Sequence, residues 1–192
     1  NLLNFSLLVT DQIKVEEEEI KLKDFLQSIK KVIQIKADNS KLKLDFSVPK
    51  NLPSIIFSDS IKITQILYNL MDTAIKNTKE KGKLLINTVI HKTELAHSEL
   101  AFTILDEATL IAPEKIRKFE ESEKLLEVYS EEIDDENQQE FLSIAMVSKL
   151  TTILGGVFNI ESTTDNGTTY SIKLPIKVGK TSKLKLGQAP ES

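Results

Sequence analysis

The stretch from residue 60 to 78 constrains the fold more than any other part of the chain. Its apolar side chains recur at helical spacing and form one broad stripe: Ile63, Ile66, Leu67, Leu70, Met71, Ala74 and Ile75. A helix with so wide an apolar face must pack against another layer of structure, because that face is unfavourable in water. The chain therefore needs a second layer that covers this helix.

Segments with strand-like patterns predict that this second layer is a β-sheet. The predicted strands are residues 42–48, 55–57, 83–90, 100–105, 157–161 and 169–175, with 13–22 as a weaker edge strand. Other helices are predicted for residues 23–39, for a short stretch from Pro113 and for residues 141–154, where Gly155 and Gly156 end the helix. This order predicts an α+β fold, a two-layer α/β sandwich in which helices cover one face of a mixed, mostly antiparallel sheet.

Composition excludes several classes of function. The chain has no cysteine, which rules out disulfides, thiolate zinc sites and cysteine nucleophiles. Its two histidines, His91 and His97, fall in a predicted loop between strands and are interpreted as surface residues. The net charge of -4 argues against a nucleic-acid partner, and no apolar run is long enough for membrane contact. Together with the lack of a signal peptide, these features predict a cytoplasmic, intracellular location.

Charge is concentrated in one segment. Residues 120–140 contain ten acidic side chains and one lysine, which predicts a mobile surface excursion. The end of the chain, residues 177–192, mixes Lys, Gly, Ser and Pro and is predicted to be a basic, flexible tail.

Polar residues follow a line on the helix predicted at residues 60–78. Asn69, Thr73 and Lys76 are four and three residues apart, so they share one stripe of that helix. By spacing alone this line is compatible with an ordinary solvated face.

The run from residue 59 to 78 resembles the N box of sensor histidine kinases, which belong to the wider histidine kinase, gyrase, Hsp90 and MutL ATPase group. The family pattern is D-x-x-R-L-x-Q-I-L-x-N-L-x-x-N-A-x-K-F-T. The matching positions are Asp59, Gln65, Ile66, Leu67, Asn69, Leu70, Ala74, Lys76 and Thr78.

Further matches follow in the family's order. Residues 102–106 resemble the strand that enters the adenine-binding Asp box, residues 116–119 the F box, and residues 142–147 the start of the next family helix. Residues 155–156 and 167–175 resemble the closing G-G and G-T-T-F-x-x-x-L-P motifs. Residues 1–6 resemble the end of the dimerisation helix that precedes this domain in the family.

The resemblance implies a histidine-kinase ATPase (Bergerat) fold and a domain layout. Residues 1–10 would end a dimerisation-type helix and allow a homodimer through the helix that ends near Val9. Residues 11–176 would form the ATPase domain, with an acidic lid at about 120–140. The implied nucleotide-site positions are Asn69, Thr73, Lys76, Asp106, Ala108, Leu110, Ser143 and Thr168, with Asn69 as a magnesium ligand and Thr73 at its partner position.

Several family residues are absent. A second Asn that coordinates the metal in the family is replaced by Thr73, a poorer ligand for a hard cation. The two glycines of D-x-G-x-G are Ala108 and Leu110, and the family's G-x-G-x-G phosphate loop aligns with residues 139–143, which contain no glycine. Asp106 and Thr168, which correspond to the pair that reads adenine in the family, are retained.

These departures lead to a main hypothesis and two alternatives. The first is a degenerate member, a pseudokinase with impaired or no ATP binding that is kept for protein partners and scaffolding, with no cofactor. The second is an active or weakly active domain that uses ATP and Mg²⁺ to phosphorylate a histidine outside this chain. The third is a binding module whose cleft holds a non-nucleotide ligand.

Overall fold

The computed structural model describes residues 13–78, 81–92, 98–107, 109–121 and 136–179, with only the backbone described for residues 136–138. Four predictions therefore lie wholly or mainly outside the described residues. They are the dimerisation-type helix at 1–10, the position of Ala108, most of the acidic segment and the tail beyond residue 179.

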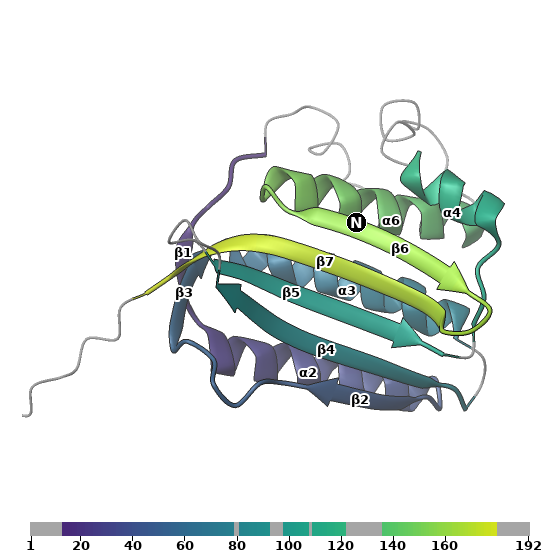
Figure 1. The fold of residues 1–192 in the computed structure, drawn as a ribbon, viewed down its shortest axis with the longest axis horizontal. Coiled ribbons are helices and arrows are strands. Elements are labelled where there is room, and N and C mark those ends of the chain that lie inside the picture. The colour runs from purple at the N-terminus through teal and green to yellow at the C-terminus, as the bar shows by residue number, and fades with distance from the viewer. Residues whose placement is uncertain (1–12, 79–80, 93–97, 108, 122–135, 180–192) are drawn as a thin grey trace, which may run out of the picture.

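One seven-stranded sheet forms the first layer (Figure 1). Its strands are β1 (Glu18–Lys21), β2 (Lys43–Ser47), β3 (Ile55–Ser58), β4 (Lys83–Lys92), β5 (Ser98–Asp106), β6 (Val157–Thr163) and β7 (Gly167–Val178). The order is β1-β3-β7-β5-β4-β2, and β6 also pairs with β7. Among the strand pairs of the described residues, only β2–β4 is parallel, so the prediction of a mixed, mostly antiparallel sheet is confirmed.

The described helices form the second layer, and they cover one face of the sheet (Figure 1). They are α2 (Leu22–Asn39), α3 (Ser60–Asn77), α4 (Pro113–Glu120) and α6 (Glu136–Ile153). The predicted stripe of α3 is buried from Ile63 to Ala74, and only Ile75 remains half-buried. The fold class, a two-layer sandwich with helices on one face, is confirmed. None of the helices described here is both long enough and apolar enough to cross a bilayer.

The start of α6 differs from the prediction. The helix begins at Glu136 rather than at residue 141, so the last five residues of the predicted acidic lid are helical. Glu140 is only 9% exposed. The composition of the segment suggested a solvated excursion, but Glu140 has polar partners on two other helices and is buried against them.

Two strand boundaries also differ. His91, predicted to lie in a loop, is in β4 opposite Glu99 of β5, because the β4–β5 ladder continues to Lys92 and Ser98. β7 continues to Val178 rather than ending before a tail at residue 177, because Lys177 and Val178 pair with β3. The N–H of Gly179 also donates to the Ile55 carbonyl, at 2.9 Å.

A buried hydroxyl in β4 permits a stability prediction. Thr88 is fully buried, and its Oγ1 is one of two buried side-chain polar atoms without a hydrogen-bond partner among the residues described. An unsatisfied buried hydroxyl costs about 1–3 kcal/mol, so Thr88→Val is expected to raise the free energy of unfolding by about 1 kcal/mol. Urea unfolding measures this change, with the half-buried Thr103→Val as control. A destabilised Thr88→Val protein would contradict the prediction.

Candidate functional site

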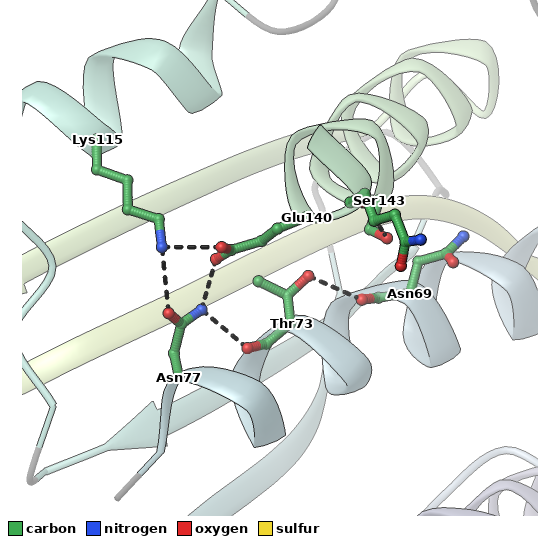
Figure 2. Close-up of polar contacts among 7 residues, drawn as sticks. Asn69, Thr73, Asn77, Lys115, Glu140 and Ser143 are labelled. Atoms are coloured by element: carbon green, nitrogen blue, oxygen red, sulfur yellow. Dashed lines mark hydrogen bonds and ion pairs between the residues drawn. The ribbon is translucent and has the colours of Figure 1, made fainter. Parts of the chain in front are cut away.

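The polar stripe of α3 faces α6. The Nδ2 group of Asn69, a half-buried residue, lies 3.0 Å from the sulfur of Met146 on α6. Thr73 is buried, and its hydroxyl donates to the Asn69 carbonyl at 3.2 Å (Figure 2). Two residues that the family resemblance assigns to the metal are thus engaged with a thioether and with their own helix.

Asn77, which the sequence analysis missed, continues this stripe toward the end of α3. Its Nδ2 donates to Glu140 Oε1 at 2.7 Å and to the Thr73 carbonyl at 2.9 Å. Lys76, which was predicted to share the stripe, is exposed. The spacing does contain the signal, because Asn77 lies four residues after Thr73 and eight after Asn69, on the same side of the helix.

Lys115 of α4 completes a three-residue cluster with Asn77 and Glu140. Its Nζ donates to Glu140 Oε2 at 2.8 Å and to Asn77 Oδ1 at 3.3 Å (Figure 2). The aromatic ring of Phe119 lies 5.6 Å from this Nζ and 5.2 Å from the ring of Phe141, measured to ring centroids. We call Asn77, Lys115 and Glu140 the carboxylate cluster. It joins three helices through one carboxylate.

Asp106 and Thr168 lie opposite each other at the paired ends of β5 and β7. Both are buried: Asp106 is 1% exposed and Thr168 is fully buried. Asp106 Oδ2 accepts from the hydroxyl of Thr78 at 2.7 Å, and the hydroxyl of Thr168 donates to the Thr109 carbonyl at 2.8 Å. The structure therefore brings these two predicted residues together, and each has a partner within the protein.

Residues 109–111, shortly after Asp106, are held by hydrogen bonds at both ends. Thr109 donates through its hydroxyl to the Asn77 carbonyl at 3.1 Å, and the N–H of Ile111 donates to the Ser162 hydroxyl at 2.9 Å. Leu110 between them is 57% exposed. Its side chain, at the position of a family glycine, is thus mostly in solvent.

Tyr170 of β7 is buried beside the carboxylate cluster. Burial raises the pKa of its hydroxyl, and the negative charges of Glu140 and Asp106 raise it further, whereas Asn77 acts in the opposite direction. The raised pKa keeps the phenol neutral at neutral pH.

The segment aligned with the family's phosphate loop is the first part of α6. Ser143 is half-buried, and its hydroxyl donates to the Gln139 carbonyl at 3.0 Å, four residues back along the helix. From the fifth residue of a helix onward, backbone N–H groups bond to carbonyls of the same helix. The N–H groups from Glu140 onward are therefore committed to α6.

These residues do not fit a metal-bound triphosphate as they are arranged. Mg²⁺ takes several oxygen ligands in near-octahedral geometry, whereas Asn69 can supply one amide oxygen, because its nitrogen contacts Met146, and Thr73 can supply only a neutral hydroxyl. Within the described ranges, no group of three or more acidic or histidine side chains is placed to hold a metal ion. The site thus offers a carboxylate held by an amide and an ammonium group, next to a buried Asp–Thr pair.

A mixed sheet with helices on one face and a polar stripe of α3 turned toward α6 define a two-layer α/β sandwich domain. Residues 58–178 match the family model described as "Histidine kinase-, DNA gyrase B-, and HSP90-like ATPase". The chain belongs to this family.

Its relatives include sensory proteins of bacteria. The chain is 25% identical over 177 residues to the "Non-motile and phage-resistance protein" of Caulobacter vibrioides, covering 92% of this chain and 20% of that protein. It is 23% identical over 177 residues to the "Adaptive-response sensory kinase SasA" of Gloeothece citriformis, covering 92% of this chain and 42% of the relative. The chain thus spans less than half the length of either relative.

Solved structures share the fold. The crystal structure of full-length ShkA in complex with AMPPNP superposes with a TM-score of 0.69 at 20% identity, over 93% of this chain and 35% of that one. The catalytic domain of the histidine kinase ThkA, in a nucleotide-free form, gives a TM-score of 0.60 at 20% identity, over 83% of this chain and 95% of that one. These likenesses show that the sandwich is that of histidine kinase catalytic domains.

Proposed function

We propose that this histidine kinase-like ATPase domain is a pseudokinase module of a two-component signalling protein, with impaired ATP binding, kept for contacts with protein partners. One observation carries the proposal: residues 139–143, which align with the family's phosphate loop, are part of helix α6. A loop can wrap phosphates with free backbone N–H groups, but from Glu140 onward the N–H groups of α6 are bonded within the helix.

The polar side chains of the site support the same conclusion. Asn69 and Thr73 are engaged by Met146 and by the helix backbone, and the Glu140 carboxylate adds negative charge beside them. A triphosphate would meet electrostatic repulsion from Glu140 in surroundings where charges interact more strongly than in water. Mg-ATP binding therefore requires several groups to rearrange together.

The relatives also suggest a proposal about the longer protein that contains this domain. The relatives include one named as a sensor protein and one named as a sensory kinase, and the chain spans a minor part of each. We infer a cytoplasmic location for this domain, protein partners, and a homodimer formed through the segment that ends near Val9. A phosphoacceptor histidine, where the protein has one, lies outside this chain.

A weakly active ATPase domain is the second candidate, and the Asp106–Thr168 pair favours it. Both residues are present, buried and directly opposite each other in the β5–β7 ladder. If Thr78 and Thr109 release them, the pair can present a carboxylate and a hydroxyl to the edge of a flat ring such as adenine.

Titration of the 192-residue chain with fluorescently labelled ATP and Mg²⁺ separates the two candidates. We expect a dissociation constant weaker than about 1 mM, equivalent to about -4 kcal/mol of binding free energy. Weak affinity is expected because the altered groups do not offer a phosphate cradle or a metal ligand set. Magnesium-dependent binding in the micromolar range would overturn the pseudokinase proposal.

A restored variant and a control refine this titration. The triple change Thr73→Asn, Ala108→Gly and Leu110→Gly tests whether those positions alone prevent binding. We expect little gain, because α6 still occupies the place of the phosphate loop. Asp106→Asn is the control for the second candidate, since it should abolish any weak binding that depends on the Asp106–Thr168 pair.

A further inference from the structure

We propose that Asn77 and Lys115 form an anion-binding site that Glu140 occupies from within the chain, and that this site takes a phosphate group once the Glu140 carboxylate is removed. The inference deepens the proposed function and rests on it, because it identifies Glu140 as the side chain that prevents phosphate from binding to Asn77 and Lys115. The class of ligand is a phosphate group, free or at the end of a nucleotide.

In the carboxylate cluster, Asn77 and Lys115 hold the Glu140 carboxylate as a site would hold a bound anion. Each oxygen of Glu140 has its own donor: the Asn77 amide lies 2.7 Å from Oε1 and the Lys115 ammonium lies 2.8 Å from Oε2. The amide nitrogen of Asn77 also donates to the Thr73 carbonyl, and its oxygen accepts from Lys115. These contacts fix the orientation of the amide, so its nitrogen is directed at the carboxylate.

The cluster is partly buried, which favours an anion beside the Lys115 ammonium group. The Glu140 side chain is 10% exposed and that of Lys115 is 31% exposed. A poorly solvated ammonium group is costly without a negative partner, and hydrogen bonds between charged groups are the stronger ones in proteins. Without the carboxylate, the Nζ of Lys115 and the Nδ2 of Asn77 would both remain directed at the vacated position.

Phosphate suits the two donors. Its oxygens accept hydrogen bonds from an amide and an ammonium at the same distances as a carboxylate does. The donors come from the end of α3 and from α4, whereas the internal anion comes from α6 (Figure 2). The occupant and the donors therefore belong to different helices, and the anion can be changed without altering the donors.

The test uses Glu140→Ala in the 192-residue chain, with inorganic phosphate as the probe. Amide NMR shifts are followed during the titration. We expect the variant to bind phosphate at least about tenfold more tightly than the wild-type chain, a difference of about 1.4 kcal/mol. Adding Lys115→Met should abolish this gain, whereas Lys118→Met, an exposed lysine on the same helix, should leave it unchanged. Equal phosphate affinity in wild type and Glu140→Ala, or a gain that survives Lys115→Met, would overturn the inference.

A second arm identifies the source of the phosphate. ATP without metal is titrated into the same variants. Tighter binding of ATP than of inorganic phosphate, dependent on Lys115, identifies a nucleotide phosphate as the ligand. Binding of inorganic phosphate alone supports the site and limits it to a small free anion.

Glu140→Gln keeps the test decisive if the alanine variant does not fold. The amide is nearly isosteric and removes only the charge, so phosphate should raise the melting temperature of Glu140→Gln more than that of the wild type. An equal shift in both would contradict the proposal. The wild-type Mg-ATP titration tests the proposed function separately, so either idea can fail without the other.

Discussion

Replacing Asp59 with alanine is expected to lower the free energy of unfolding by about 3–5 kcal/mol, as for other broken buried ion pairs. Asp59 is 2% exposed, precedes α3 and caps it: its Oδ1 accepts from the Lys62 N–H at 2.9 Å. Its Oδ2 accepts from the Lys62 ammonium at 2.5 Å and from the N–H of Glu16 at 2.9 Å. Alanine would leave Lys62, itself 9% exposed, as a buried charge without this partner.

Chemical denaturation in urea measures the loss, and Asp59→Asn is the matched control. Asparagine keeps an acceptor at the helix cap but loses the charge, so it should destabilise the protein less than alanine does. If the two variants were equally stable, the capping acceptor that asparagine retains would contribute nothing measurable to stability.

Asp59 also gives the protein a pH-dependent stability. Burial acts to raise the pKa of this carboxyl, but hydrogen bonds from the Lys62 side chain and from the N–H groups of Lys62 and Glu16 outweigh it. The pKa therefore falls below its ordinary value of 3.8. A lowered folded-state pKa adds stability that is present above the unfolded pKa and is lost as the pH falls through the folded value. The loss of stability between about pH 5 and pH 2 should be smaller in Asp59→Asn than in the wild type. This pH window begins about one unit above the ordinary pKa of the carboxyl and extends below it, because the folded-state pKa is lowered.

Replacing Gly167 with alanine is expected to lower the free energy of unfolding by about 2–5 kcal/mol, from a left-handed backbone and from overpacking. The backbone φ of Gly167 is +71°, and a Cβ there would lie 2.1 Å from the carbonyl oxygen of Asp106. The clash is with backbone, so no side chain can move to relieve it. Separation of β5 from β7 would also part Asp106 from Thr168.

Gly155 provides the matched control for this prediction. Its φ is +74°, but an added Cβ would meet only the Pro175 side chain, at an ordinary 3.5 Å. Gly155→Ala should therefore cost only the conformational part, about 1–2 kcal/mol. Thermal or urea unfolding of the two variants compares them directly, and equal losses would show that the β5–β7 end tolerates a methyl group.

Local sequence patterns were sufficient to predict most helices and strands of the fold. The apolar stripe of α3, the strand-like patterns of β4 and β5 and the two glycines after α6 each act over a few residues. The structure has a helix, strands and a helix end in those places. The ordered motifs were sufficient for the family, because they span most of the domain. Element ends were less accurate, since the ladders of β4 and β7 extend wherever a neighbouring strand offers a partner.

The candidate site was predicted only in part. Asn69, Thr73, Asp106 and Thr168 were assigned through motifs, and the structure places them on α3 and at the paired ends of β5 and β7. Asn77 and Lys115 were not assigned, although both contact Glu140. Glu140 itself was interpreted as part of a solvated acidic run, because composition cannot show that one acid in ten has a lysine partner.

The sequence by itself determined the elements, the sandwich and the family, because periodicity and capping are local and the motifs occur in a fixed order. Only the tertiary structure decided which polar side chains meet. Glu140 is 25 residues from Lys115 and 63 from Asn77, and their contact depends on how α6 packs over α3 and α4. Such packing is set by the whole buried core, so no local pattern of charges specifies it.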